Sequence, residues 1–297
     1  MKLYAPKYYN DFKCIADKCT HSCCIGWEID IDPDTLEKYN TLECSYGDTI
    51  RKSIVGDEPH FALCDGERCP HLDKSGLCKI ISLLGDGYLC DICREHPRFY
   101  NDAPCGTEVG LGMACEEACR LILNSDCYDE IIEIEGSDEE LESTEFDPTE
   151  HRAFIYSILK SRDVSYTDRI QSIYKEYGIS PLQLSDTEWR TLINDLEYLD
   201  PSHKELFSCY ASNACVGKEH EVYLERALAY FIYRHCTEAY DYRELCARLG
   251  FCLFCERLLS SLLNKCGEDV FLFARVISEE LEYSTDNTEA IMSKFLD

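Results

Sequence analysis

Basic residues are scarce in this chain of 297 residues. Lys and Arg together number 29 against 57 Asp and Glu, which gives a formal net charge of −28. Because a negative field of this size repels phosphate backbones, we expect no nucleic acid among the partners. The charge favours a basic partner, or a substrate that presents lysine side chains. It is equally typical of an ordinary acidic, soluble surface.

Long hydrophobic runs are also absent. The most apolar stretch, residues 249–263, is shorter than the roughly 20 apolar residues of a membrane helix, and it includes Glu256 and Arg257. The first residues contain neither the apolar segment nor the small-residue cleavage site of a secretory signal. The sequence therefore predicts a protein with no transmembrane segment and a cytoplasmic location.

Cysteine, in contrast, is abundant. The chain has 21 cysteines, an odd number that cannot pair completely within one molecule. Thiols stay reduced in the cytoplasm, so a cysteine-rich cytoplasmic chain points to metal or thiol chemistry rather than to structural disulfides.

The cysteine distribution divides the chain. Fourteen cysteines lie between Cys14 and Cys127, and seven lie between Cys209 and Cys266. Between Asp126 and Glu150 there are twelve acidic residues and no Lys or Arg. We predict a cysteine-rich, metal-binding region at 1–127, an acidic linker at 128–150 and an α-helical region at 151–297.

Helical patterns dominate, so the predicted fold is mainly α. The N-terminal region is predicted to consist mainly of loops that a bound metal would cross-link. A helical C-terminal region is predicted to follow it. A helix is expected to begin at Asp32-Pro33, and Ser185 and Glu188 form a capping-box pattern. Apolar residues recur with helical spacing in residues 115–124, 151–162, 221–236, 242–263 and 268–282.

Two groups of cysteines in the first region have the density of metal sites. Four cysteines follow a C-x4-C-x3-C-C pattern from Cys14 to Cys24, and the second group runs from Cys64 to Cys93. Such soft donors favour an iron–sulfur cluster or zinc, and the region has enough ligands for two centres. Cys90-x-x-Cys93 alone is also compatible with a redox dithiol. Ten further cysteines are predicted to be packed in the core: Cys44, Cys105, Cys127, Cys209, Cys215, Cys236, Cys246, Cys252, Cys255 and Cys266.

Several motifs together resemble one family. They occur in residues 12–19 (FKCIADKC), 23–27 (CCIGW), 69–72 (CPHL), 76–80 (GLCKI), 93–98 (CREHPR), 114–118 (ACEEA) and 230–235 (YFIYRH). In this order they resemble the flagellin lysine N-methylase (FliB-type) family. The N-terminal half is also similar to YkgJ-type cysteine-cluster proteins that are thought to bind zinc or iron.

The resemblance implies a cytoplasmic enzyme that moves a methyl group from S-adenosylmethionine to lysine side chains of flagellin. It also implies a cysteine-bound cluster, [4Fe–4S] or zinc. The matching positions carry over as candidate ligands: Cys14, Cys19, Cys23, Cys24, Cys69, Cys78, Cys93 and Cys115. Extra cysteines, Cys90 among them, leave the choice between Cys90 and Cys93 open.

Lysine must lose its proton before it can attack a methyl sulfonium, so such an enzyme needs a base or a desolvated pocket. Candidate catalytic residues are His235, Tyr230 and His96, with His71 and Tyr233 as further possibilities. Candidate cofactor-binding residues, suited to a carboxylate or to cluster charge, are Arg94, Arg98 and Arg234. For Arg94 and Arg98 the alternative is an ordinary salt bridge with Glu95, Asp91 or Asp102.

The sequence contains little that independently indicates a methyl-donor site. Its glycine-rich stretch, residues 106–112 (GTEVGLG), lacks a clear strand–turn–helix context, and we interpret it as a plain turn rather than a cofactor loop. The C-x3-C-x2-C triplet of radical methionine-cofactor enzymes is missing. Two alternatives therefore stand beside the methylase: a non-enzymatic zinc- or iron-binding protein, and a thiol redox protein that uses Cys90 and Cys93.

Overall fold

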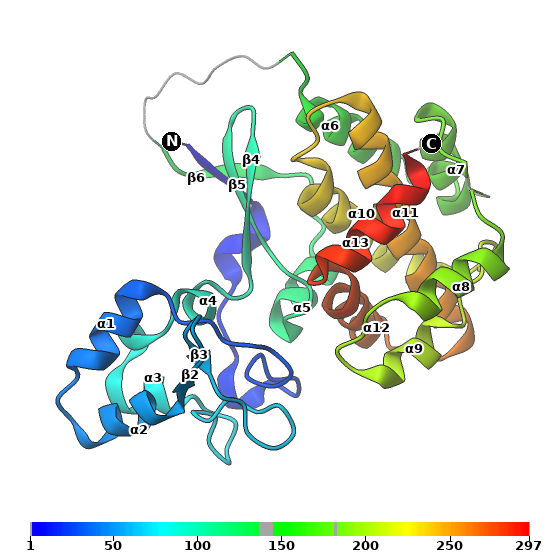
Figure 1. Cartoon of the computed structure of the whole chain (residues 1–297). Coiled ribbons are helices and arrows are strands. Elements are labelled where there is room, and N and C mark those ends of the chain that lie inside the picture. The colour runs from blue at the N-terminus through cyan, green and yellow to red at the C-terminus, as the bar shows by residue number, and fades with distance from the viewer. Residues whose placement is uncertain (1, 137–144, 181–182, 297) are drawn as a thin grey trace. The chain divides into compact units, whose positions relative to one another are not determined.

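The computed structural model describes residues 2–136, 145–180 and 183–296, which form two compact units (Figure 1). Residues 13–98 and 115–117 make up one unit, which we call the cysteine-rich unit. Residues 1–12, 99–114 and 118–297 make up the other, which we call the helical unit. The cysteine-rich unit is thus inserted in the chain between two parts of the helical unit.

Short elements and loops build the cysteine-rich unit. Its helices and strands are α1 (Pro33–Thr41), α2 (Ser45–Ser53), β2 (Ile54–Val55), β3 (His60–Phe61), α3 (Lys79–Leu84) and α4 (Asp91–Glu95). As predicted, α1 begins after Asp32, whose carboxylate accepts a hydrogen bond of 2.9 Å from the backbone N–H of Thr35. Its small core contains Tyr39, Ile50 and Phe61 together with the buried thiols of Cys69 and Cys90.

A four-stranded mixed sheet belongs to the helical unit. Its strands are β1 (Leu3–Pro6), β4 (Arg98–Ala103), β5 (Gly106–Leu111) and β6 (Ile131–Glu135), in the spatial order β4-β5-β1-β6. Strand β1 pairs in parallel with β5, placing Tyr4 opposite Glu108, and antiparallel with β6, placing Ala5 opposite Ile132. The strand nearest the start of the chain therefore lies inside the sheet.

Helices make up most of the helical unit, which confirms the mainly α prediction. They are α5 (Glu116–Asn124), α6 (Pro148–Leu159), α7 (Tyr166–Glu176), α8 (Asp186–Asp195), α9 (Pro201–Phe207), α10 (Lys218–Cys236), α11 (Tyr242–Lys265), α12 (Val270–Ile277) and α13 (Thr285–Met292). The capping box predicted at Ser185 and Glu188 is present at the start of α8. Helices α10 and α11 pack against each other (Figure 1), and most of their residues are buried.

The sheet itself is a departure from the sequence analysis. The glycine-rich stretch predicted to be a turn is strand β5, because its residues pair with β1 and are almost all buried. The predicted acidic linker, residues 128–150, contains β6, whose isoleucines are half-buried while Glu133 and Glu135 are exposed. The rest of that segment includes residues 137–144, which lie outside the described residues.

The two compact units also have other boundaries than the predicted regions. Residues 1–12, 99–114 and 118–127 fall within the predicted cysteine-rich region, but they group with the helices because β1, β4 and β5 share one sheet with β6. Whether the predicted ranges behave as separate domains stays a prediction.

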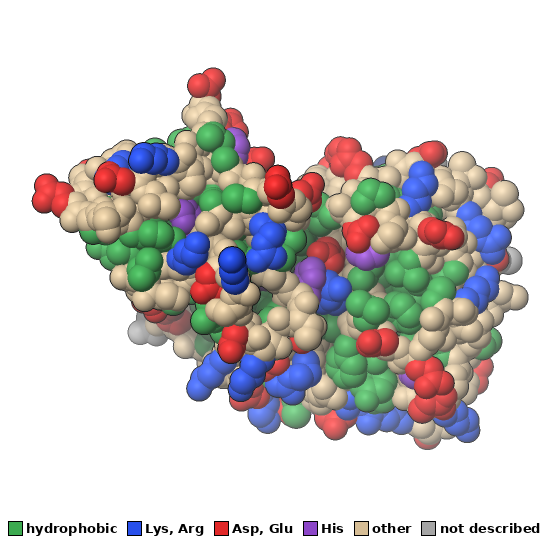
Figure 2. Space-filling model, turned by 90° about the horizontal axis from the view of Figure 1, so that it is seen from below, with side chains coloured by type: hydrophobic (Ala, Val, Ile, Leu, Met, Phe, Trp, Pro, Cys, Tyr) green, Lys and Arg blue, Asp and Glu red, His purple; other side chains and the backbone are tan. Residues whose placement is uncertain are grey.

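Across the residues that the structure describes, no helix combines the length and the apolar character that crossing a bilayer requires. On the face shown in Figure 2, Lys and Arg side chains lie among the acidic ones, and hydrophobic side chains gather in patches. Among the aliphatic side chains, Leu83 on α3 is one of the most exposed, at 61%.

Candidate functional site

Six thiols gather in the cysteine-rich unit. Cys69 and Cys90 are buried in its core, and Cys24, Cys78 and Cys93 pack against that core. The sixth member is Cys23, whose thiol hydrogen-bonds that of Cys24. We call Cys23, Cys24, Cys69, Cys78, Cys90 and Cys93 the thiol cluster.

Backbone pairing brings distant parts of the sequence to this cluster. The amide of Cys69 donates to the carbonyl of Cys24 over 2.8 Å. A β-bridge between Leu72 and Cys78 turns the chain back, so that Cys78 returns towards Cys69. Cys90 precedes the first turn of α4 and Cys93 lies within it, where the two thiols hydrogen-bond each other.

The cluster members influence one another electrostatically. Burial, together with the neighbouring thiols of Cys78 and Cys90, raises the pKa of Cys69 to about 11. The hydrogen bond from Cys24 lowers the pKa of Cys23 to about 7, while the pKa of Cys24 is raised. In the same way the pKa of Cys90 is lowered by Cys93, and that of Cys93 is raised. Each hydrogen-bonded pair therefore has one member that ionises more readily than the other.

A second, smaller group lies elsewhere in the cysteine-rich unit. The carboxylate of Glu116 accepts hydrogen bonds from the backbone amides of Thr20 (2.7 Å) and His21 (3.0 Å) and lies 3.5 Å from the thiol of Cys19. Burial raises the pKa of Cys19 to about 12, and the charges of Glu116 and Cys115 add to this shift. Of the eight predicted ligands, Cys19 and Cys115 thus form a separate pair, and Cys14 is exposed.

The donor set of the thiol cluster fits a soft metal or an iron–sulfur cluster in its chemistry. The positions of the thiols, however, do not form a complete metal site. Within the described part of the chain, no three Cys, His, Asp or Glu side chains are placed so that they would jointly hold a metal ion. The thiols are therefore gathered but not arranged as ligands.

His71 has the environment of a structural histidine. Its Nδ1 lies 2.9 Å from the hydroxyl of Tyr46, and its Nε2 lies 3.0 Å from the hydroxyl of Ser53. The ring also packs edge-on against Phe61. Burial lowers the pKa of His71 to about 4, so the ring is neutral and both of its nitrogens are hydrogen-bonded.

Three predicted site residues lie at the end of the cysteine-rich unit. Arg94 forms ion pairs with Asp91 and Glu95, the alternative that the sequence offered. Burial, and then the charge of His21, lowers the pKa of His96 to about 4. Arg98 is half-buried at the first position of β4.

The other three predicted site residues meet in the helical unit. On α10, Tyr230 donates to Oε2 of Glu282 over 3.0 Å and accepts from Arg234 and from the amide of Met113. His235 Nε2 lies 2.7 Å from Oε1 of the same carboxylate. The side chain of Glu282, at the end of a π-helical turn (Ser278–Glu282), is fully buried.

These residues form one buried polar network around Glu282. Burial lowers the pKa of His235 despite the adjacent carboxylate, whereas Arg234 and His235 hold the pKa of Glu282 below its usual value against the effect of burial. The guanidinium of Arg234 also makes cation–π contacts with the rings of Phe99 (4.9 Å) and Tyr283 (4.7 Å). The nearby Tyr233 donates instead to the carbonyl of Val109 in the sheet, over 3.1 Å.

Two central groups are not apparent from the sequence. Glu282 lies on the apolar helical pattern of residues 268–282, but its three partners come from α10, 47 to 52 positions earlier in the chain. The sequence offers Cys90 and Cys93 as alternatives, whereas both belong to the thiol cluster.

The cysteines predicted to be packed in the core divide. Cys236, Cys252 and Cys255 are buried as expected. Cys105, Cys127, Cys209 and Cys246 are half-buried, and the prediction was wrong for Cys44, Cys215 and Cys266, which are exposed. Cys44 caps the start of α2, Cys266 caps the end of α11, and Cys215 lies in the loop before α10.

Comparison with known proteins gives three informative relatives. The lysine-N-methylase of Salmonella choleraesuis (strain SC-B67) is 30% identical over 133 residues, covering 40% of this chain and 32% of that protein. The lysine-N-methylase of Salmonella typhimurium (strain LT2) gives the same values. The flagellar biosynthetic protein FliU of Salmonella muenchen is 28% identical over 131 residues, covering 40% of this chain and 75% of that protein.

The match thus spans about a third of the length of the two lysine-N-methylases. No family model and no solved structure matches the chain. The similarity to YkgJ-type proteins stays a prediction. Over 40% of its length the chain is related to the lysine-N-methylases, which confirms the resemblance to the flagellin lysine N-methylase family.

Proposed function

We propose that this protein transfers methyl groups from S-adenosylmethionine to the ε-amino groups of protein lysines, and that flagellin is its substrate. The names of two relatives support lysine methylation, and the name of the third supports a flagellar role. The net charge of −28 agrees with a substrate that presents lysines. Nucleic acid is not expected as a partner, and a cytoplasmic location is part of the same proposal because the thiols would stay reduced there.

The observation that carries the proposal is the thiol cluster. Cys24, Cys69, Cys78 and Cys93 were predicted as ligands from the family motifs, and the fold gathers them with Cys90 around one small core. We propose that four of these thiols hold a [4Fe–4S] cluster or a zinc ion after side-chain adjustment. A bound iron–sulfur cluster supplies electrons, whereas zinc supplies structural cross-linking of a loop-rich unit.

The predicted roles of single residues belong to the same proposal. His235 is a candidate base because its lowered pKa keeps the imidazole neutral and able to accept a proton. Tyr230 and His96 are the other catalytic candidates. Arg94, Arg98 and Arg234 are candidates for binding the carboxylate of the methyl donor. In the helical unit, Glu282 orients His235, Tyr230 and Arg234 together.

The test begins with anaerobic purification of the full chain. Iron, sulfide and zinc are quantified, and electron paramagnetic resonance is recorded after reduction. Transfer of radiolabelled methyl groups from S-adenosylmethionine to flagellin is then measured. We expect bound iron with matching sulfide and labelled flagellin lysines, both lost in Cys93→Ala and both kept in Cys266→Ala, which alters an exposed thiol outside the cluster.

Two other results would change the conclusion. Metal binding without methyl transfer to any lysine-containing protein would favour the non-enzymatic metal-binding protein. Alkylation of Cys90 or Cys93 in a metal-free but folded chain, together with reversible disulfide formation between them, would favour the redox alternative.

A further inference from the structure

Two thiols of the helical unit meet away from all the predicted site residues. Cys209 lies just after the end of α9, and Cys266 is the C-cap residue of α11, 57 positions later in the sequence. Their thiols hydrogen-bond each other. Cys266 is exposed, and Cys209 is half-buried. The pair therefore combines a thiol that solvent reaches with a second thiol directly beside it.

The packing of the loop after α9 on α11 holds the backbone of Cys209 in place. The next residue, Tyr210, is buried, and its ring stacks on that of Phe254 in α11 with the ring centroids 5.2 Å apart. The amide of Ala211 donates a hydrogen bond of 3.0 Å to the hydroxyl of Ser261, also in α11. The meeting of the two thiols is thus fixed by the fold of the helical unit.

The ends of the two helices leave the sulfur atoms room to come closer. A disulfide places its sulfur atoms about 2 Å apart, so the two thiols must approach before they can be joined. Cys209 and Cys266 both follow the last residue of their helix. Gly267, directly after Cys266, has a φ of +138°, and a Cβ atom added there would meet nothing within 4 Å. Side-chain rotation with a small shift of the backbone is therefore sufficient for the approach.

The surroundings give the two thiols different roles. Burial raises the pKa of Cys209 to about 12, and the charge and hydrogen bond of Cys266 add to this rise, whereas the charge of Lys265 opposes it. Exposed Cys266 is the thiol that meets an oxidant first. Once Cys266 is oxidised it carries no charge, so its effect on the pKa of Cys209 ends while that of Lys265 remains. Cys209 then ionises more readily and becomes the second reactant.

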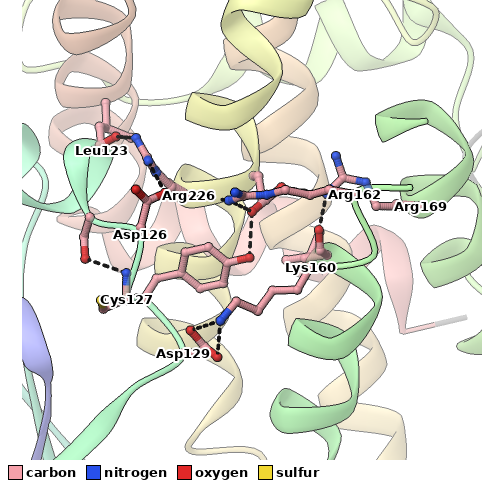
Figure 3. Close-up of polar contacts among 12 residues, drawn as sticks. Leu123, Asp126, Cys127, Asp129, Lys160, Arg162, Arg169 and Arg226 are labelled. Atoms are coloured by element: carbon pink, nitrogen blue, oxygen red, sulfur yellow. Dashed lines mark hydrogen bonds and ion pairs between the residues drawn. The ribbon is translucent and has the colours of Figure 1, made fainter. Parts of the chain in front are cut away.

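Other thiols of the helical unit lack this combination of exposure and a thiol partner. The Sγ atoms of Cys236 and Cys252 lie 3.9 Å apart, but both residues are buried, and buried thiols react poorly. Cys127 is half-buried, yet it hydrogen-bonds Glu130 instead of a thiol, and this carboxylate raises its pKa. Figure 3 shows Cys127 beside its neighbour Asp126, among charged side chains.

We propose that Cys209 and Cys266 form an oxidation site, at which a hydroperoxide converts the two thiols into a disulfide that thiol reductants reverse. The oxidant is hydrogen peroxide or another small hydroperoxide, which reaches Cys266 from solvent. This inference goes beyond the proposed methyl transfer and does not depend on it, because neither cysteine has a role in that reaction.

The oxidation has two steps. The thiolate of Cys266 attacks one oxygen of the peroxide, the O–O bond breaks, and the departing hydroxide takes up the proton that Cys266 lost. Sulfur is thereby oxidised to a sulfenic acid, and the peroxide is reduced. The thiolate of Cys209 then attacks the sulfenic sulfur, the S–O bond breaks, and the second hydroxide takes up the proton of Cys209. Two thiols and one hydrogen peroxide thus give one disulfide and two water molecules.

The experiment uses the full chain, reduced, freed of reductant and treated with a small excess of hydrogen peroxide. Remaining thiols are blocked with N-ethylmaleimide, and the monomer band of a non-reducing gel is digested with trypsin and chymotrypsin. Chymotrypsin cleaves after Tyr210 and so separates Cys209 from Cys215. We expect mass spectrometry to find peptides linked through Cys209 and Cys266, and the link should disappear after treatment with dithiothreitol.

Two variants test the order of the steps. In Cys209→Ser the sulfenic acid at Cys266 has no thiol to react with, so dimedone should label Cys266 about tenfold more than in the unaltered chain. The control is Cys215→Ser, which alters another exposed thiol only six residues from Cys209. This control variant should give the same yield of the linked peptides as the unaltered chain.

Two results would overturn the proposal. Absence of the linked peptides from the unaltered chain, with or without sulfenic acid at Cys266, would show that the contact between the thiols does not lead to a disulfide. Equal yields of a Cys209–Cys215 link and a Cys209–Cys266 link would show that oxidation is unselective. Both results are read from peptide masses, so they hold whatever the metal content or the methyl transfer of the same protein.

Discussion

The carboxylate of Glu108 accepts two hydrogen bonds from the guanidinium of Arg152, of 2.5 and 2.6 Å, in the interior of the helical unit. Both side chains are almost completely buried. The hydroxyl of Thr237 accepts from Arg152 and donates to Glu108, so that β5, α6 and the residue after α10 meet at one point. This contact joins the sheet, which was not predicted from the sequence, to helices that were predicted.

We expect Glu108→Ala to lower the free energy of unfolding by about 3–5 kcal/mol, because it leaves the charge of Arg152 buried without a partner. The double variant Glu108→Leu/Arg152→Met should recover much of this loss, since it removes both charges. Urea unfolding monitored by circular dichroism measures both. A loss below about 1 kcal/mol in the single variant would contradict the burial of this pair.

Gly110 in β5 permits a close approach of Phe99. A Cβ atom at Gly110 would lie 2.2 Å from Cζ of the Phe99 ring. We therefore expect Gly110→Ala to destabilise the protein by about 1–3 kcal/mol through overpacking. The control is Gly87→Ala, where an added Cβ meets nothing within 4 Å. Equal unfolding midpoints for the two variants would show that the ring moves aside without cost.

His203 should make stability depend on pH. Its Nδ1 lies 2.6 Å from Oε1 of Glu280. Burial lowers the pKa of His203, but the hydrogen bond and charge of Glu280 outweigh burial and leave the pKa raised. The contribution is therefore complete below the unfolded pKa of about 6.5 and is lost as the pH rises through the folded value.

Replacement by His203→Gln should accordingly cost more stability near pH 5.5 than near pH 8.5, by about 1.4 kcal/mol for each unit by which the pKa is raised. Urea unfolding of both proteins at the two pH values measures the difference. An identical loss at both pH values would show that His203 remains neutral in the folded protein.

Two buried cysteines should behave differently when replaced. Cys69→Ala removes a member of the thiol cluster and should abolish metal binding, if our proposal is correct. Cys255→Ala leaves a small cavity in α11 and should lower stability by about 1 kcal/mol while metal content is unchanged. Metal analysis by mass spectrometry, next to thermal unfolding, separates the two effects. Unchanged metal content in Cys69→Ala would remove this thiol from the proposed ligands.

The helices were predictable because their signals are local. Asp32 and Pro33 mark the start of α1, and Ser185 with Glu188 marks that of α8, each within four residues. The sheet was not predicted, because β5 is buried on both faces and shows no alternation. In β6 the alternation of isoleucine with Glu133 and Glu135 was present in the sequence, but the acidic run obscured it.

The grouping of the thiols depends on tertiary structure. Cys23 and Cys24 are adjacent, yet it is a backbone bond from Cys69 that brings the second cysteine segment to Cys24. Spacing alone could not separate Cys19 and Cys115 from the main cluster. The same limit applies to the proposed oxidation site, whose two thiols meet through the packing of the loop after α9 on α11 and not through any motif.

The insertion of the cysteine-rich unit between β1 and β4 has a consequence for the order of assembly. During synthesis, β1 is made first, and its parallel neighbour β5 is made only after residues 13–98. The pairing of β1 with β5 can therefore form only after that. The inserted unit, apart from residues 115–117, is complete by then. If the thiol cluster holds the metal that we propose, it is complete before the sheet closes. A fragment that starts at β4 lacks the strand that joins β5 to β6.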